Sequence, residues 1–544
     1  MKNQSVTYAT MFLALAWFSF LPQIHAVAPP PGGCYPNFTT AEGCDALSLL
    51  STGAGNTGLG WRALFLDSSG SFNTGVGVGA LVLNNADSNT AVGAAALLLN
   101  TSGTENTALG TGALVYNDTG NSNDAVGAFA LFNNTDGFSN NAFGNSALLQ
   151  NVHAYDNTAI GDSALRSNDV TGNGVANDNT AVGARALFSN TDGDSNTAVG
   201  FDALSSNLTG GDNTANGAFA LVFNTTGSEN TANGFEALFS NTTGEQNTAS
   251  GHSALLNNTT GIQNTANGAL ALFDNTTGNF NTAIGTQALN NNTTGGANTA
   301  TGNAALFSNS TGEFNTAFGE GALNLNTTGN ANVAIGAGAG GGVLTADNVI
   351  CIGATVGGNN VSNTCFIGNI RGVTTHNANA IPVLIDSAGQ LGTASSSARF
   401  KTDIKFMNNA SEAILALKPV TFQYKSDTSS TPQFGLIAEE VANVNPDLVV
   451  RDGNGEIYTV RYDAVNAMLL NEFLKEHRKV EEQQAAITEL KAVVEQQQKE
   501  FQAAIADQRK QFEARLKQQD ARIQRISTQL ELNNSTTRTV ANNE

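Results

Sequence analysis

The chain is dominated by a 17-residue repeat. An asparagine recurs at this spacing, with one interval of 16 and one of 22, at positions 56, 73, 89, 106, 123, 140, 157, 179, 196, 213, 230, 247, 264, 281, 298, 315 and 332. A glycine follows four residues after each, from Gly60 to Gly336, and a leucine eight residues after, from Leu64 to Leu323. A short, fixed period is typical of a stacked array in which each repeat is one structural unit. Most of the first two thirds of the chain is therefore predicted to form a rod.

One repeat suggests how a coil of this rod is built. Asn196 to Val199 alternates as a short strand does, and Gly200 permits a sharp bend. Ala203 and Leu204 supply apolar side chains that a single coil cannot bury but stacked coils can. Stacking also places the Asn and Thr side chains in register, so they are expected to form hydrogen-bonded ladders. We predict a mostly β fold with a parallel β-solenoid, or β-roll, shaft over residues 29–375, about 95 Å long at roughly 4.8 Å per coil. Whether Ala-Leu lies on a strand or on one helical turn stays open.

The charge of the chain is unevenly distributed. Residues 1–398 hold 5 Lys/Arg against 24 Asp/Glu, whereas residues 399–544 hold 19 against 21. An acidic rod is a poor partner for a phosphate backbone, so we expect no nucleic-acid binding. The abundance of Asn, Thr and Gly is also typical of disordered segments, but a disordered linker has no reason to keep a strict register.

The first residues indicate export. Lys2 precedes the apolar run from Met11 to Phe20, and Ala26-Val27-Ala28 offers a small-residue cleavage site, so residues 1–28 are predicted to be a signal peptide. The run is short for a membrane span, and no second apolar stretch follows. An uncleaved anchor is the alternative. We therefore expect a secreted or cell-surface protein with no membrane span in the mature chain.

The cysteines and polar turns give little indication of disulfides, bound metals or attached glycans. Cys34 and Cys44 could pair in an oxidising compartment, whereas Cys351 and Cys365 lie at different offsets and are expected to face different sides. No Cys/His spacing suggests zinc, and the nonapeptide calcium pattern is missing, so no metal and no cofactor are expected. Many Asn-x-Thr triplets match glycosylation sequons, but the Asn/Thr ladder explains them better.

The last repeats end in Asn332-Val333-Ala334-Ile335-Gly336 and Asn363-Thr364-Cys365-Phe366-Ile367-Gly368. They resemble the Asn-Ser-Val-Ala-Ile-Gly repeats in the heads of trimeric autotransporter adhesins. The resemblance covers roughly residues 39–370 and implies a left-handed parallel β-roll. The chain departs from that family at residues 533–544, a polar tail in place of a membrane-barrel anchor.

At about residue 376 the repeat gives way to the pattern of a small α+β module, predicted over residues 376–464. Four motifs follow in order: Ser-x-x-x-x-Lys-x-x-Ile from Ser396, Leu-x-Pro-Val-x-Phe-x-Tyr from Leu417, Gly-Leu-Ile-Ala-Glu-Glu-Val from Gly435, and Val-x-Tyr from Val460. This ordered set resembles the self-cleaving intramolecular chaperone of endosialidase-type phage tail spikes, over about residues 395–480. The resemblance implies a homotrimer in which the module guides folding of the preceding fibre and then cuts itself off.

The resemblance assigns a Ser–Lys dyad to Ser396 and Lys401, with the cut between Ser395 and Ser396. The chemistry is reasonable, because a serine hydroxyl needs a base and a lysine can serve once its amine is neutral. Ser397 stands where many members of that family carry an acidic residue, and the triple serine leaves Ser395 and Ser397 as alternative nucleophiles. A chaperone that has lost cleavage is the other reading. The chain is thus at most a single-turnover serine peptidase.

From about Val465 the chain lacks Gly and Pro and is rich in Glu, Gln, Lys and Ala. Apolar residues recur every seven residues at Phe473, Val480, Ile487, Val494 and Phe501. This heptad stripe predicts a coiled coil over residues 465–532 and self-association.

Two functions follow from these patterns. The first is an exported trimeric fibre or adhesin-like protein, whose ligand on a cell surface or glycan is unknown. The alternative is a phage-derived tail-spike enzyme that degrades surface glycans. A glycosidase needs two carboxylates at a set separation, and the acidic residues of the rod, such as Asp202, Glu236 and Glu320, lie at variable repeat offsets.

Overall fold

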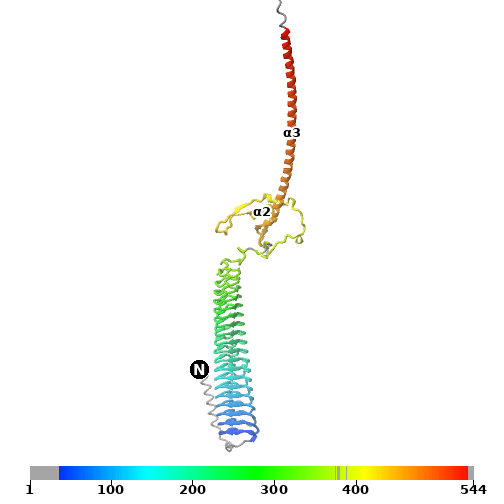
Figure 1. Ribbon diagram of the computed structural model, residues 1–544. Coiled ribbons are helices and arrows are strands. Elements are labelled where there is room, and N and C mark those ends of the chain that lie inside the picture. Colours follow the sequence, from blue (N-terminus) through cyan, green and yellow to red (C-terminus); the bar gives the residue numbers. More distant parts are fainter. Residues whose placement is uncertain (1–35, 374, 377–379, 387–388, 537–544) are drawn as a thin grey trace, which may run out of the picture. The chain divides into compact units, whose positions relative to one another are not determined.

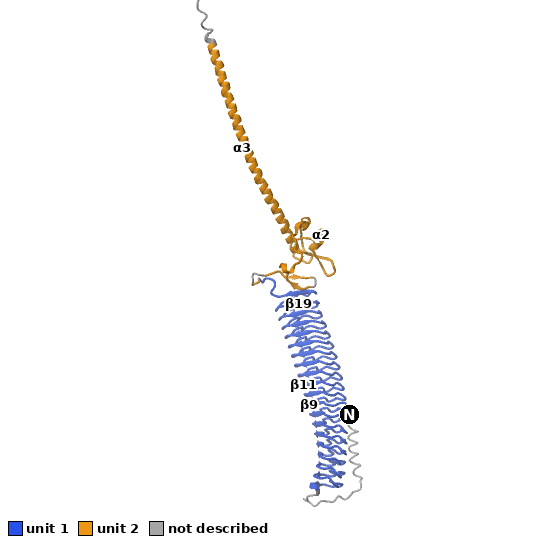
Figure 2. Cartoon of the chain, turned by 90° about the vertical axis from the view of Figure 1, so that its right-hand side faces the viewer, with its two compact units in different colours: residues 1–374 blue, residues 375–544 orange. Residues whose placement is uncertain are grey.

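The computed structural model describes residues 36–373, 375–376, 380–386 and 389–536, and side chains up to Leu532 (Figure 1). The chain forms two compact units, residues 1–374 and 375–544 (Figure 2). The predicted signal peptide, Cys34 and most of the polar tail lie outside the described residues. Within the described part of the chain, we find no helix with the length and apolar character that a membrane crossing needs.

The first unit is the predicted parallel β-solenoid. Its twenty strands form one sheet, and each strand pairs in parallel with the next along the chain, as Thr197 does with Thr214. The strands are β1 (Thr40–Glu42), β2 (Thr57–Leu59), β3 (Thr74–Val76), β4 (Thr90–Val92), β5 (Thr107–Leu109), β6 (Asp124–Val126), β7 (Asn141–Phe143), β8 (Thr158–Ile160), β9 (Thr180–Val182), β10 (Thr197–Val199), β11 (Thr214–Asn216), β12 (Thr231–Asn233), β13 (Thr248–Ser250), β14 (Thr265–Asn267), β15 (Thr282–Ile284), β16 (Thr299–Thr301), β17 (Thr316–Phe318), β18 (Val333–Ile335), β19 (Val349–Ile352) and β20 (Thr364–Ile367). A 3₁₀ turn, η2 (Pro36–Phe38), precedes them.

The Ala-Leu segment is neither a strand nor a helical turn. Every leucine of this column, from Leu47 to Leu323, has a positive φ of 48° to 54°. In the coil after β10, Leu204 N–H donates to Ala220 O of the next coil at 3.0 Å, and Asn207 N–H donates back to Leu204 O at 3.1 Å. A left-handed leucine costs free energy. Burying a leucine side chain, as at Leu204 with 0% exposure, contributes about 1.5–3 kcal/mol and offsets that cost.

Two asparagine ladders run through the shaft. In the repeat column, Asn213 Nδ2 donates to Asn196 Oδ1 at 3.1 Å and to Gly227 O at 2.9 Å. In a second column, Asn207 Nδ2 donates to Asn190 Oδ1 at 2.8 Å and to Gly210 O at 2.9 Å. Each amide therefore joins its own coil to a neighbouring one, which satisfies buried polar groups all along the core.

The asparagines of many sequons belong to the second ladder. Asn207, Asn224 and Asn241 are each 0% exposed, and their amides are engaged in ladder hydrogen bonds. The threonine after Asn224 also contributes, because Thr225 Oγ1 donates to Thr242 O at 2.9 Å. The ladder interpretation of these triplets is confirmed, and the folded shaft does not present these amides for glycosylation.

The two late cysteines face opposite sides, as expected. Cys351 is buried in the core, whereas Cys365 is exposed and lies opposite Ile350 rather than Cys351 in the strand register.

Asp67 occupies the place of an asparagine at the N-terminal end of the second ladder. Its Oδ1 accepts from Gly70 N–H at 2.8 Å and its Oδ2 from Asn73 Nδ2 at 3.1 Å. Burial raises the pKa of the Asp67 carboxyl to about 6, against hydrogen bonds from Gly70, Asn73 and Asn84 that lower it. A raised carboxyl pKa stabilises the fold at low pH, and that contribution is lost as pH rises through about 6.

We therefore expect Asp67→Asn to stabilise the first coils at pH 7.5 by about 1–3 kcal/mol and to have little effect near pH 4. Hydrogen exchange of residues 57–90 at both pH values measures this. Asp118→Asn, which changes an exposed carboxylate on a later turn, is the control. A gain of the same size at both pH values for Asp67→Asn would contradict the burial argument.

The second unit contains short elements before a long helix. The strands pair as three antiparallel hairpins: β21 (Leu384–Ile385) with β22 (Leu391–Gly392), β23 (Val420–Phe422) with β24 (Gln433–Gly435), and β25 (Val449–Arg451) with β26 (Ile457–Val460). The helical elements are η3 (Ala398–Phe400), η4 (Asn408–Ala416), α2 (Ala438–Val444), η5 (Pro446–Leu448) and α3 (Tyr462–Thr536). The buried core of this unit is small and consists of Val441, Leu448, Val449, Val460 and Met468.

Candidate functional site

The predicted dyad lies in an exposed segment around η3. One 3₁₀ turn separates the two residues, since Phe400 N–H donates to Ser397 O and Lys401 N–H donates to Ala398 O, both at 3.1 Å. Ser397 N–H donates to Ser395 Oγ at 3.3 Å. Among the described residues, no hydrogen bond joins Ser396 to Lys401. The structure thus places the two residues one turn apart without bringing their reactive atoms together.

The surroundings of the dyad are uncovered in the single chain. Ser396 and Lys401 are both exposed. Phe400, Ile404 and Phe406 on the same segment are 63%, 67% and 94% exposed. The segment that carries the predicted dyad therefore presents three large apolar side chains to solvent in the single chain.

The other motifs of the module hold its fold together. Tyr462 Oη accepts from Leu436 N–H at 3.1 Å, so the Val-x-Tyr motif contacts the Gly-Leu-Ile motif. A Cβ on Gly435 would lie 2.8 Å from the same Tyr462 oxygen, so a larger residue there would displace the Tyr462 side chain. The Pro-Val-x-Phe motif supplies β23, which pairs with β24 just before this contact.

A buried polar cluster, which the sequence analysis did not identify, ties η4 to α3. Ser411 is 0% exposed, and its hydroxyl donates to Glu472 Oε1 at 2.5 Å and accepts from Asn471 Nδ2 at 2.6 Å. Lys475 Nζ lies 2.7 Å from Glu472 Oε1 and 3.5 Å from Glu412 Oε1. The i,i+3 spacing of Glu472 and Lys475 is a sequence signal for their ion pair. Ser411 lies 61 residues before Glu472, so no local pattern connects it to that pair.

This cluster also contains a serine beside a lysine, but its charges exclude a second dyad. The hydrogen bond from Lys475 and then that from Ser411 lower the pKa of the Glu472 carboxyl. The same pairing with Glu472 raises the pKa of the Lys475 ammonium. A lysine held in its protonated form cannot take the proton of Ser411. The cluster therefore positions the start of α3.

The long helix α3 leaves its apolar stripe uncovered. It contains 75 residues, and Phe473, Val480, Ile487, Val494 and Phe501 are 46% to 67% exposed. Isolated helices gain little stability in water, and a long stripe at heptad spacing is typical of helices that pack on one another.

A glycosidase site needs a second carboxylate, and the grooves described in this structure do not supply it. The groove between η4 and α2, about 370 Å³, is lined by Ala416, Leu417, Lys418, Ile437, Glu440, Val441, Asn443 and Val444. Glu440 is the one carboxylate there. This groove therefore does not offer the carboxylate pair that a glycosidase needs.

Residues 396–450 match the model of the Peptidase S74 family, described as chaperone of endosialidase. The match begins at Ser396 and covers the first three motifs. Neither the curated proteins nor the solved structures contain a match to this chain. The chaperone resemblance is thus shown for this segment, which follows a long parallel β-solenoid.

Proposed function

We propose that this protein is an exported, trimeric fibre whose C-terminal module assembles the trimer and then releases itself by Ser396–Lys401 self-cleavage. The β-solenoid shaft and the chaperone segment are those of a tail-fibre or tail-spike type of protein. Export and a secreted or cell-surface location rest on the predicted signal peptide, residues 1–28.

The single observation that carries the proposal is the uncovered apolar stripe of α3. Other copies of the chain are the natural partners, because each brings an identical stripe. A helix pairs locally and quickly, whereas a solenoid must order many coils. Association through α3 would therefore bring the chains together before the shaft is complete.

Assembly would also complete the dyad. A lysine in water is protonated at neutral pH and cannot act as a base. Lys401 and the nearby Phe400 and Phe406 are exposed in the single chain, and burial against neighbouring copies would favour a neutral amine. Self-cleavage would thus follow trimer formation rather than precede it.

The test is the oligomeric state of the full-length protein, measured by sedimentation equilibrium. We expect a trimer for the wild type and a monomer for Ile487→Glu combined with Val494→Glu. Each substitution would bury a charge in the seam, which is the apolar stripe where the helices pack together. We expect burial of the charge to cost about 3 kcal/mol per chain, which weakens association more than a hundredfold. Met468 and the Ser411 cluster stay intact in this variant, so the module itself should still fold.

The matched control adds the same two charges to the outer face of the helix. Ala485→Glu with Ala492→Glu lies on the side of α3 away from the stripe, and we expect this variant to remain a trimer. A monomeric wild type, or a seam variant that stays trimeric, would refute the proposal.

A further inference from the structure

One outward-facing column of side chains on the shaft changes from apolar to polar over four coils. The third strand position faces outward, and in most coils it is apolar, as at Ile160 and Val199 before the change and Ile284 after it. In β11 to β14 the column reads Asn216, Asn233, Ser250 and Asn267. The coil geometry does not require this, because the neighbouring strands keep the same register with apolar residues.

These polar groups are free to bind a ligand. Among the described residues, the side chains of Asn216, Asn233 and Asn267 are exposed and make no hydrogen bond to protein, unlike the ladder asparagines of the core. The same holds for the hydroxyl groups of the outward threonines beside them in this part of the structure: Thr214, Thr231, Thr248 and Thr265. Amides and hydroxyls both donate and accept hydrogen bonds.

An aromatic column runs along the same coils. Phe219 lies 5.4 Å from Phe201 and 5.9 Å from Phe235 between ring centroids, and Phe235 stacks on His252 at 5.5 Å. Phe201 is 47% exposed and Phe235 43%. We call the threonine, asparagine and aromatic columns of β10 to β14 together the mixed face. It combines apolar ring surface with unpaired hydrogen-bonding groups at one repeat per coil, roughly 4.8 Å.

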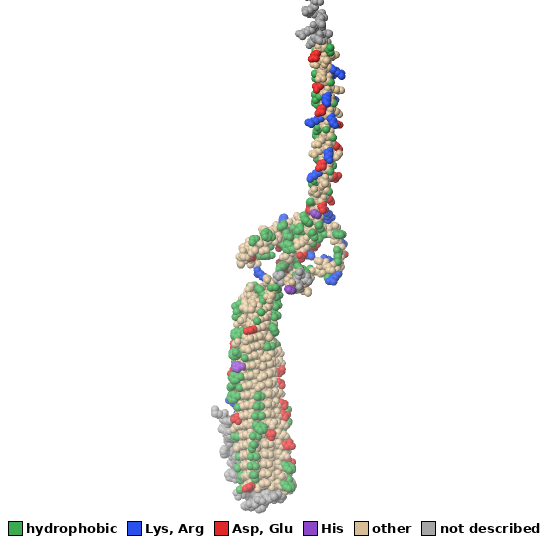
Figure 3. All heavy atoms as spheres, viewed as in Figure 1, with side chains coloured by type: hydrophobic (Ala, Val, Ile, Leu, Met, Phe, Trp, Pro, Cys, Tyr) green, Lys and Arg blue, Asp and Glu red, His purple; other side chains and the backbone are tan. Residues whose placement is uncertain are grey.

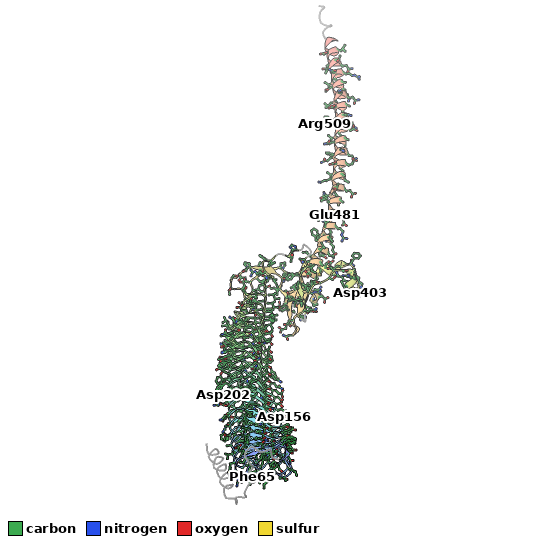
Figure 4. The ribbon with its side chains drawn as sticks, turned by 60° about the horizontal axis from the view of Figure 1, so that its bottom comes forward. Phe65, Asp156, Asp202, Asp403, Glu481 and Arg509 are labelled. Atoms are coloured by element: carbon green, nitrogen blue, oxygen red, sulfur yellow. The ribbon has the colours of Figure 1, made fainter. Side chains whose placement is uncertain are left out.

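The charge around the mixed face is negative. No Lys or Arg occurs between residues 186 and 370, and Arg185 at its edge is paired with Asp202 at 2.8 Å. Asp202, which follows Phe201, is partly buried and is labelled on the shaft in Figure 4. In the space-filling view, blue Lys and Arg side chains gather on the second unit, while green columns run along the shaft (Figure 3). An anionic polymer would meet no Lys or Arg other than Arg185, whose charge is offset by Asp202, and would be repelled.

We propose that the mixed face binds a neutral polysaccharide laid along the shaft. A sugar polymer repeats, so successive units would meet successive coils. Its hydroxyl groups would exchange hydrogen bonds with the free amides and threonines, and its C–H surfaces would pack against the aromatic column. Many weak, equivalent contacts along one chain add up to useful affinity. The proposal depends neither on trimer formation nor on self-cleavage.

The test is affinity electrophoresis of the full-length protein in native gels that contain galactomannan, dextran or laminarin, with hyaluronan as the anionic polymer. We expect retardation by at least one neutral polymer and none by hyaluronan. Asn216→Ile, Asn233→Ile and Asn267→Ile together give the column the apolar character it has elsewhere. This triple variant should weaken binding at least tenfold, and Phe235→Ala, a smaller change, should also weaken it.

The controls make the same kinds of change outside the mixed face, both at the third strand position. Thr301→Ile and Phe318→Ala should bind as the wild type does. Equal losses in these controls, no retardation by any neutral polymer, or stronger retardation by hyaluronan would overturn the proposal. So would protection of Asn233→Cys from maleimide in the assembled protein, because the face would then be covered by another copy.

Discussion

Gly200→Ala is expected to break the shaft between β10 and β11. Gly200 has a φ of +140°, and a Cβ there would lie 2.5 Å from Gly217 O and 2.6 Å from Gly217 C of the next coil. Both atoms belong to the backbone, so neither can move without separating the coils. The strain and the overlap together should cost at least about 4 kcal/mol.

The damage should stay local at first, because each coil contacts only its neighbours. We expect a new protease-sensitive site between residues 199 and 217, with a lower midpoint of thermal unfolding for the full-length protein. Gly357→Ala is the control, since a Cβ at that glycine meets nothing within 4 Å. It should change stability by less than about 1 kcal/mol. An intact, protease-resistant Gly200→Ala shaft would contradict the tight stacking of this glycine column.

The shaft could be predicted from the sequence because its contacts repeat. A fixed period places Leu204 and Leu221, or Asn196 and Asn213, at equivalent positions of neighbouring coils, so one repeat explains the next. The left-handed backbone at Leu204 could not be predicted in this way. Leucine rarely adopts a positive φ, and only the burial of its side chain in the finished stack makes that conformation favourable.

The second unit was less predictable, because its contacts join distant residues that share no repeat. Its helix η4 (Asn408–Ala416), for example, is a 3₁₀ helix that no repeated pattern in the sequence marks. Ser411 gives no sign in the sequence of its contact with Glu472, since that contact exists only once η4 packs on α3. The dyad is also hard to judge from the sequence, because Ser396 and Lys401 are exposed in the single chain and no contact fixes their side chains there.

The largest effect is expected at Ser396. On our proposal, Ser396 Oγ attacks the carbonyl carbon of Ser395 while Lys401 takes the hydroxyl proton and passes it to the departing Ser396 nitrogen. The peptide C–N bond breaks, an ester joins Ser395 to Ser396 Oγ, and water then hydrolyses that ester. The reaction needs no second molecule besides water, because nucleophile and bond are adjacent in the chain.

Intact mass spectrometry of the purified wild type should therefore find a shaft that ends at Ser395 and a fragment from Ser396 to Glu544. Ser396→Ala should abolish the split and leave an uncut trimer, because loss of one exposed hydroxyl barely affects packing. Lys401→Met should also block cleavage, whereas Ser397→Ala should not. Hydroxylamine, which attacks esters, should accelerate release in the wild type and in Ser397→Ala but not in Ser396→Ala.

The same measurement separates the register of the nucleophile from the need for assembly. Cleavage that is lost in Ser397→Ala and kept in Ser396→Ala would move the nucleophile by one residue. The seam variant Ile487→Glu with Val494→Glu should remain uncut, since no neighbouring copy covers Lys401 in the monomer. Cleavage of that monomer at the wild-type rate would show that a single chain builds the dyad. A wild type that stays uncut as a folded trimer would show that this module acts as a chaperone alone.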